Sequence, residues 1–265
     1  AGASTTARKQ HARNTAQQDG FLHSFHNKAT GASLIFRTAH ILNGVALMMD
    51  ADAAKLASQV EGVKSVRPIM LAVPHMSTST PFIGVPHAWE SSGVGLTGEG
   101  VRVAIIDTGI DYLHRNFGGS GSEADYEAND PTVLDVGFPS AKIIGGYDLA
   151  GTNYDAGDAD LTTPEPDPDP MDGDGHGSHV AGTTAGFGVN ADGSTCAGPY
   201  DSSLDFASMK IGPGVAPGAL IYAVKVFGDI AGTTALTMAG LEWAIDPNQD
   251  GDPSDRVDVI NMSLG

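Results

Sequence analysis

Apolar and polar positions along the chain predict two units of different architecture. In the first unit, helices with an apolar stripe alternate with strands that turn at Asn43-Gly44, a pair suited to positive φ. The helices are expected at residues 15–28 and 51–61, and the strands at residues 33–42, 43–50 and 63–71. Asp50 is expected to cap the second helix and Gly62 to end it. We predict a single short sheet with both helices on one face.

The second unit follows a polar, proline-containing linker at residues 74–86. Its strands are expected at residues 101–107, 142–148, 219–226 and 257–264, and its helices at residues 176–187 and 233–245. This alternation predicts a parallel sheet with crossover helices, in which ligands bind outside the carboxyl ends of the strands. Residues 150–175 are rich in Asp, Gly and Pro, so we expect a solvated loop there. No internal repeat is found.

The composition is that of a globular protein. A chain of 265 residues, 41% of them hydrophobic, can bury one large core or a small and a large one. Disordered and fibrous classes are therefore excluded. No apolar run approaches the roughly 18 residues that span a bilayer, and no charged-then-apolar leader is found. Because Ala1 stands where an initiator Met would, we expect that upstream sequence was removed or never included.

Charge is distributed very unevenly along the chain. Residues 1–75 hold eight Lys/Arg and four Asp/Glu, a net charge of +4, whereas residues 76–265 hold six and 28, a net charge of −22. The reversal predicts two units with different roles. It argues against nucleic acid as a partner of the larger unit, because phosphate binding requires clustered Lys and Arg. The acidic surface can serve solubility alone, or can hold a metal ion or the basic segment.

Two polar residues stand where catalytic groups are expected. Asp107 ends an apolar strand, where a carboxylate is costly unless it accepts hydrogen bonds or faces a cation; taken alone, it would most simply cap the next turn. His176 follows about seventy residues later, between glycines that allow close backbone approach. A His held between a carboxylate and a hydroxyl can act as general base and acid. His179 is expected to be an ordinary helix residue, and Cys196, the only cysteine, has no neighbour that would activate its thiol.

Two segments resemble the Asp and His signature segments of the subtilisin-like serine proteases, namely VAIIDTGID and DGDGHGSHVAGTTAG. A third, VINMSLG, is similar to the strand on which that family binds the substrate backbone, and the order Asp, His and then Ser also matches. The resemblance implies a three-layer α/β domain with a parallel sheet, a secreted, extracellular endopeptidase and polypeptide substrates. Residues 17–75 resemble the family's propeptide, a small ferredoxin-like α+β module that assists folding and inhibits the protease until it is cleaved.

Carried over by residue, the resemblance implies that Asp107 orients the base and that His176 is general base and acid. Ser263, Leu264 and Gly265 would pair with the substrate backbone as an added strand. Ser263 lies in a predicted strand without a strand-to-helix elbow, so it is not the expected nucleophile. The family's nucleophilic Ser and its oxyanion-hole Asn fall after this position. We therefore expect the chain to be truncated before the catalytic Ser and to be inactive alone.

The implied organisation is a propeptide (residues 1–75), a linker (76–86) and the N-terminal part of a peptidase domain (87–265). The opposite charges of module and body fit an intramolecular inhibitor, and cleavage is expected between Val73 and Ser79. The alternative is a protease-inhibiting, folding-assisting propeptide attached to an inactive subtilase-like domain. Intact Asp107 and His176 motifs favour the enzyme.

No cofactor is required for this chemistry, but residues 246–255 could hold structural calcium. Asp246, Asn248, Asp250 and Asp252 alternate as the oxygen ligands of a calcium loop do, with Gly251 at the turn. The twelfth position of the pattern is occupied by a valine and not by the usual Glu, so a solvated acidic turn is the competing interpretation. If calcium binding were the main role, the chain would be a structural module and not a protease.

Overall fold

The computed structural model describes residues 2–26, 28–29, 31–69, 84–90, 95–134, 136–201, 203–230 and 232–265, with side chains from residue 6 onward. The chain forms two compact units. The N-terminal unit comprises Ala1–Leu71 and Ala235–Arg256, and the sheet unit comprises Ala72–Thr234 and Val257–Gly265. The domain limits predicted at residues 75 and 87 stay a prediction.

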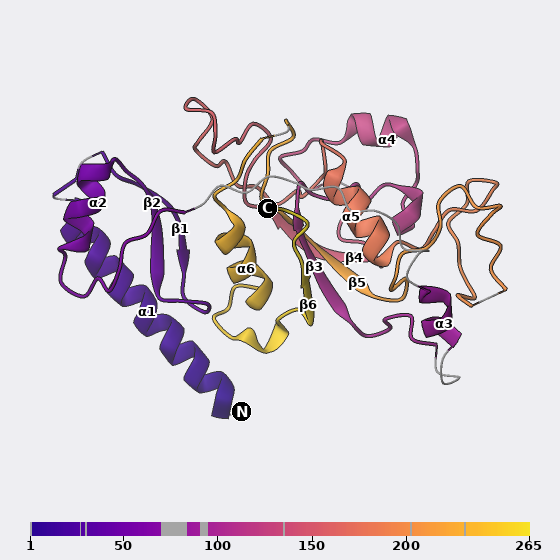
Figure 1. The fold of residues 1–265 in the computed structure, drawn as a ribbon, viewed down its shortest axis with the longest axis horizontal. Coiled ribbons are helices and arrows are strands. Elements are labelled where there is room, and N and C mark those ends of the chain that lie inside the picture. The colour runs from indigo at the N-terminus through magenta and orange to yellow at the C-terminus, as the bar shows by residue number, and fades with distance from the viewer. Residues whose placement is uncertain are drawn as a thin grey trace. The chain divides into compact units, whose positions relative to one another are not determined.

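The N-terminal unit combines a long helix with a two-stranded antiparallel sheet (Figure 1). Its elements are α1 (Gly2–His26), β1 (Ser33–Thr38), β2 (Gly44–Met48), α2 (Ala51–Ser58) and α6 (Thr237–Ile245). Asp50 caps α2 as predicted, because its side chain accepts from the backbone N–H groups of Asp52 and Ala53 at 3.0 and 2.7 Å. Phe25, Ala57 and Val60 belong to its small core.

Two predictions for this unit are wrong. Residues 63–69 form no strand, and the rest of the predicted strand 63–71 lies outside the described residues. Pro68 cannot donate to a strand ladder, and most of this stretch is exposed. The first helix begins at Gly2 and not near residue 15. Its N-terminal half is polar and shows no apolar stripe, so the hydrophobic pattern does not predict it, although its Ala, Gln, Arg and Lys residues favour helix.

The sheet unit contains four parallel strands in the order β4-β5-β3-β6. The strands are β3 (Arg102–Asp107), β4 (Ile143–Asp148), β5 (Leu220–Lys225) and β6 (Val259–Asn261). The helices are α3 (Val85–Glu90), α4 (Glu123–Ala128) and α5 (His176–Ala185). The predicted mixed α/β class with a parallel sheet is confirmed. The last two residues of the predicted linker 74–86 belong to α3, which begins at Val85. Residues 74–83 of that linker lie outside the described part of the chain.

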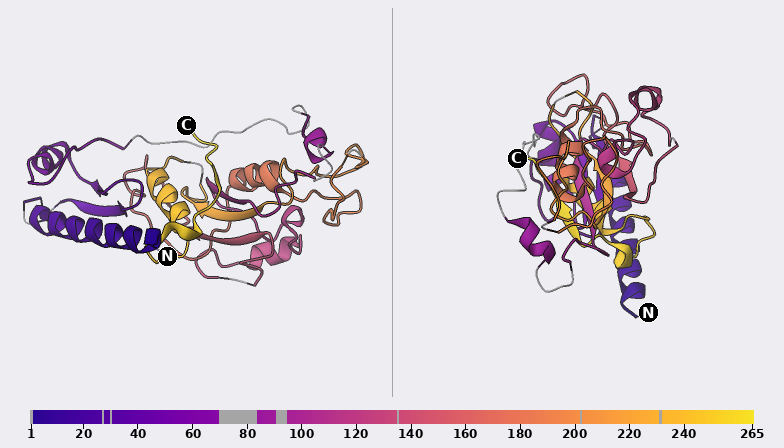
Figure 2. Two further views of the ribbon diagram at one scale, coloured as in Figure 1. Left: turned by 90° about the horizontal axis from the view of Figure 1, so that it is seen from below. Right: turned by 90° about the vertical axis from the view of Figure 1, so that its right-hand side faces the viewer.

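Helix α5 lies along one face of this sheet (Figure 2). Its Val180, Ala181 and Ala185 join a buried cluster with apolar residues of β3 and β5. Strand β6 is shorter than the predicted 257–264, and residues 150–175 contain no helix and no extended strand, as expected. Among the described residues, no helix has the length and apolar character needed to cross a bilayer.

Candidate active site

Asp107 is the last residue of β3, and its exposure is 0%. The chain turns directly after it, where Gly109 has a φ of +113° and an added Cβ would lie 2.6 Å from the carbonyl oxygen of Pro170. Only glycine fits that position. Asp107 therefore stands at the carboxyl edge of the sheet, in register with Lys225 at the end of β5.

His176 is the first residue of α5, and glycines on both sides allow the helix to begin there. Gly175 has a φ of 100° and forms the N-cap. A Cβ on Gly177 would lie 2.2 Å from the backbone oxygen of Gly109. The helix start therefore packs directly against the turn that follows β3, which brings His176 to Asp107.

The His176 and Asp107 side chains form a buried pair. Nδ1 of His176 lies 2.7 Å from Oδ1 of Asp107, which also accepts from the Thr108 backbone N–H at 2.8 Å. Burial raises the pKa of Asp107 above its ordinary value, while the bonds from His176 and Thr108 oppose that rise. When Asp107 is ionised, it orients the ring with the proton on Nδ1, so that Nε2 can accept a proton from a hydroxyl.

Three polar residues near this pair had no predicted catalytic role. The carboxylate of Asp172 accepts from the hydroxyl groups of Thr108 and Ser178 at 2.8 and 2.7 Å. The sequence offers one signal, the position of Asp172 four residues before His176. Its burial could not be predicted, because it lies in a loop whose composition indicates solvation.

The predicted substrate-binding residues Ser263, Leu264 and Gly265 follow β6, the strand beside β3. The Ser263 hydroxyl donates to the side-chain oxygen of Asn261 at 3.0 Å. Because β3 and β6 are parallel, these residues follow the same sheet edge at which Asp107 lies. Their role in binding substrate stays a prediction.

The acidic turn 246–255 uses its carboxylates within the N-terminal unit. Asp246 accepts from the backbone N–H groups of Gly251 and Asp250 at 2.8 and 3.2 Å, and it also contacts the His40 ring at 3.3 Å. Arg8 of α1 lies 3.0 Å from Asp250 and 3.3 Å from Asp252. No group of three acidic, His or Cys side chains within the described ranges is arranged to hold a metal ion. Calcium binding here stays a prediction.

Glu242 of α6 binds the connection between β1 and β2 in the same unit. One carboxylate oxygen accepts from the backbone N–H groups of Ala39 and His40, the latter at 2.6 Å, and the other accepts from Ile41 at 3.1 Å. Bonds from amides to a carboxylate are stronger than neutral ones. Three consecutive amides are therefore held by one side chain of α6.

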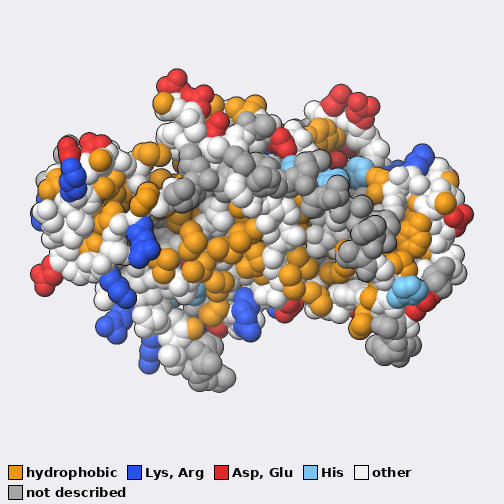
Figure 3. All heavy atoms as spheres, viewed as in Figure 1, with side chains coloured by type: hydrophobic (Ala, Val, Ile, Leu, Met, Phe, Trp, Pro, Cys, Tyr) orange, Lys and Arg blue, Asp and Glu red, His pale blue; other side chains and the backbone are white. Residues whose placement is uncertain are grey.

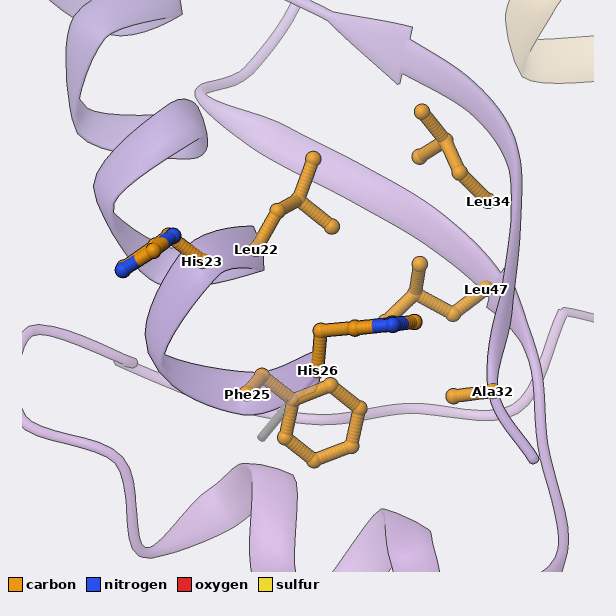
Figure 4. Close-up of a pocket in the computed structure, with 7 residues that line it drawn as sticks. All are labelled: Leu22, His23, Phe25, His26, Ala32, Leu34 and Leu47. Atoms are coloured by element: carbon orange, nitrogen blue, oxygen red, sulfur yellow. The ribbon is translucent and has the colours of Figure 1, made fainter. Parts of the chain in front are cut away.

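A cavity of about 480 Å³ lies between α1 and the two-stranded sheet (Figure 4). It is lined by Leu22, His23, Phe25, His26, Ala32, Leu34 and Leu47. This lining includes no acid, hydroxyl or thiol, so it offers no nucleophile and no carboxylate to orient either His. The cavity is therefore not a candidate for hydrolytic chemistry.

Known proteins with similar sequences are proteases. The model of the subtilase family matches residues 98–265. The minor extracellular protease Vpr of Bacillus subtilis (strain 168) is 35% identical over 193 residues, covering 72% of this chain and 17% of that protein. Subtilisin-like protease SBT2.3 of Arabidopsis thaliana is 29% identical over 238 residues, covering 85% and 26%. The chain thus spans about a quarter or less of the length of these relatives.

Proposed function

The chain belongs to the subtilase family of proteases, and from this premise we propose that it carries two catalytic side chains of a secreted serine endopeptidase together with its inhibitory propeptide. Asp107 orients the base, and His176 takes a proton from a serine hydroxyl and returns it to the leaving amine. The serine is supplied by sequence outside residues 1–265. Ser263, Leu264 and Gly265 pair with the backbone of a polypeptide substrate.

The buried contact of 2.7 Å between His176 Nδ1 and Asp107 Oδ1 is the observation that carries this proposal. The two residues come from the end of a strand and the start of a helix, 69 positions apart. A carboxylate and an imidazole so placed, with Nδ1 occupied, leave Nε2 to activate a hydroxyl. The shares of 17% and 26% that the chain covers of its relatives support a nucleophile elsewhere in a longer protein.

Labelling with a fluorophosphonate probe, together with casein hydrolysis, tests this proposal. The longer parent protein should be labelled and should cleave casein, and both signals should fall by about a thousandfold or more in His176→Ala and Asp107→Asn. His179→Ala is the matched control, because His179 is an exposed residue one turn further along α5. Cleavage by residues 1–265 alone that is lost in His176→Ala would show that the nucleophile lies within them.

We also propose that residues 1–75 inhibit the parent protease by docking on α6. The bonds from Ala39, His40 and Ile41 to Glu242 support this, since they join the N-terminal module to a helix of the peptidase segment. The net charges of +4 and −22 favour the same association. In this arrangement the module is an intramolecular inhibitor of the protease, and its removal exposes α6.

The inhibitor proposal is tested with the mature parent enzyme and added peptide 1–75. Nanomolar to micromolar inhibition of casein cleavage is expected. Glu242→Gln in the enzyme should raise the inhibition constant by about tenfold to a hundredfold, because an amide nitrogen would face backbone donors. Glu99→Gln makes the same chemical change at an exposed position and should leave the constant unchanged. Equal inhibition of all three enzymes would refute docking through Glu242.

A further inference from the structure

Asp172 is a buried carboxylate, 2% exposed, that stands four residues before His176. Its two oxygens accept five hydrogen bonds, all of them from the loop, from the end of β3 or from the start of α5. The donors are Thr108 Oγ1 (2.8 Å), Asp174 N (3.1 Å), Gly175 N (2.9 Å), Ser178 N (2.8 Å) and Ser178 Oγ (2.7 Å). The bonds from Asp174 and Gly175 satisfy the local turn, and the other three join different elements.

The two hydroxyl groups bound by Asp172 each have a second bond across the site. Because Thr108 donates its hydroxyl proton to Asp172, the oxygen can accept from the backbone N–H of Gly177, at 2.8 Å. The Ser178 oxygen accepts from the backbone N–H of Asp111, also at 2.8 Å. Thr108 and Asp111 follow β3, whereas Gly177 and Ser178 belong to α5. One carboxylate therefore fixes both hydroxyl bridges between strand end and helix start.

These bridges surround the Asp107 and His176 pair closely. The backbone N–H of Thr108 donates to Asp107, and Gly177 directly follows His176. The negative charge of Asp172 also adds to the rise in the pKa of Asp107. The charge of Asp172 thus opposes the ionisation of Asp107 that the pair requires. Because Asp172 is buried, contact with water does not explain why a carboxylate stands at this position. Its contribution must lie in the geometry that it imposes.

We propose that Asp172 is a positioning residue whose carboxylate joins the end of β3 to the start of α5 and thereby holds the His176 ring against Asp107. The inference rests on the proposed function only for its effect on catalysis. Displacement of a catalytic group by about 1 Å can lower the rate by about a hundredfold. A network that fixes both partners from one point would prevent such displacement.

Proton NMR of residues 1–265 tests the positioning directly. The His176 Nδ1 proton, bound to Asp107 in a buried contact, should give a slowly exchanging low-field resonance that disappears in His176→Ala. Asp172→Asn should broaden this resonance or shift it upfield, whereas Asp158→Asn should leave it unchanged. Asp158 lies in the same acidic loop but is exposed, and its side chain accepts only from Asp160 in the bonds within the described residues.

Substitutions of Ser178 distinguish a positioning role from an effect of charge. They also provide a second test in case Asp172→Asn fails to fold. Ser178→Ala removes one bridge without changing charge and should weaken the resonance, and Ser178→Thr should preserve it. Circular dichroism establishes that each compared variant is folded. An unchanged resonance in Asp172→Asn or in folded Ser178→Ala would overturn the proposal. So would its absence from the unsubstituted chain, because the fixed pair would then not exist in solution.

In the parent protease, Asp172→Asn should lower kcat by about 30-fold and leave KM within about twofold, since orientation and not substrate binding is lost. Ser178→Thr should retain kcat. An equal loss in Asp158→Asn, or a change confined to KM, would contradict a positioning role. If the parent protein has no hydrolytic activity at all, the proposed function fails, while the resonance comparison still decides the role of Asp172.

Discussion

Gly177 sets how closely α5 can approach the end of β3. Because a Cβ there would lie 2.2 Å from a backbone oxygen, Gly177→Ala must displace the helix or the turn. We expect destabilisation of about 1–3 kcal/mol. Gly20→Ala in α1 is the matched control, since nothing lies within 4 Å of its new Cβ, and it should stabilise by about 0.5–1 kcal/mol. Urea unfolding measures both, and a stabilised Gly177→Ala would contradict the close contact.

Asp148, at the end of β4, is a buried carboxyl group whose protonation affects the stability of the fold. It is 1% exposed, and its Oδ2 has no hydrogen-bond partner among the described residues. Burial raises its pKa to about 7, with the charge of Lys225 and two backbone N–H groups opposing the rise. The unfolded chain releases this proton near 3.8, so between these values the native state binds more protons and stability falls as pH rises.

Asp148→Asn should remove this loss because the amide stays neutral. Its Tm, relative to that of the unsubstituted chain, should rise by about 5 °C or more between pH 5 and pH 8. Thermal unfolding followed by circular dichroism measures the difference at each pH. Asp158→Asn, at an exposed position of the same unit, should show a constant difference. If the Tm difference between Asp148→Asn and the unsubstituted chain stayed constant or decreased from pH 5 to pH 8, Asp148 would not be a buried, proton-binding carboxyl.

Motif context in the sequence predicts some of the buried polar residues and misses others. Asp107 and His176 could be singled out because an apolar strand and flanking glycines mark their positions. Asp172 and Asp148 could not, because their burial depends on contacts that are distant in sequence, with the end of β3 for Asp172 and with β5 for Asp148. Acidic composition indicates solvation on average, and it does not reveal which carboxylate the fold encloses.

Among the elements, α2 offers a direct test of a local signal. Asp50 accepts from two backbone N–H groups at the start of this helix, which has only eight residues. Asp50→Ala should lower the stability of the N-terminal unit by about 1 kcal/mol, because two amides lose their partner. Asp50→Asn keeps one accepting oxygen and should cost less. Urea unfolding measures both variants, and equal stability of all three chains would show that the cap contributes nothing.

The sequence predicts best the elements that have a clear pattern of apolar residues. The strands β3, β4 and β5 each lie within one residue of their expected limits, because a largely apolar run marks each of them. The absent strand over residues 63–69 and the early start of α1 were missed for opposite reasons. Valines and isoleucine suggested a strand that Pro68 cannot extend, and a polar sequence concealed a helix that its propensities favour.

For the whole molecule, the charge division predicts how salt affects inhibition. Lys and Arg side chains gather on the visible surface formed by α1, β1, β2 and α2 (Figure 3), and the net charges are +4 and −22 for residues 1–75 and 76–265. The rate at which peptide 1–75 binds the mature parent enzyme should fall about tenfold between roughly 0.02 and 0.5 M NaCl. Stopped-flow fluorescence measures this rate.

Substitution of Arg8 tests how much of that salt effect comes from direct ion pairs. Arg8→Gln removes the pair with Asp250 and Asp252, whereas Lys9→Gln removes the same charge from an exposed residue with no ion pair in the described structure. Dissociation should be faster in Arg8→Gln, and association should be slowed similarly in both. Equal dissociation rates would assign the electrostatic contribution to long-range attraction alone.

The row formed by Asp107, Lys225 and Asp148 constrains how the sheet assembles. Lys225 stands in register with Asp107 on one side and with Asp148 on the other, at the ends of three parallel strands. Nζ of Lys225 pairs with Asp229 and donates to the carbonyl oxygen of Thr108 after β3 at 3.0 Å, and its charge opposes the rise in the pKa of Asp148 at the end of β4. Closing only one strand pair would therefore bury this ammonium group before all of its polar neighbours had arrived. The three strands should therefore open and close as one cooperative unit, and their core amides should share a single free energy of opening in native-state hydrogen exchange.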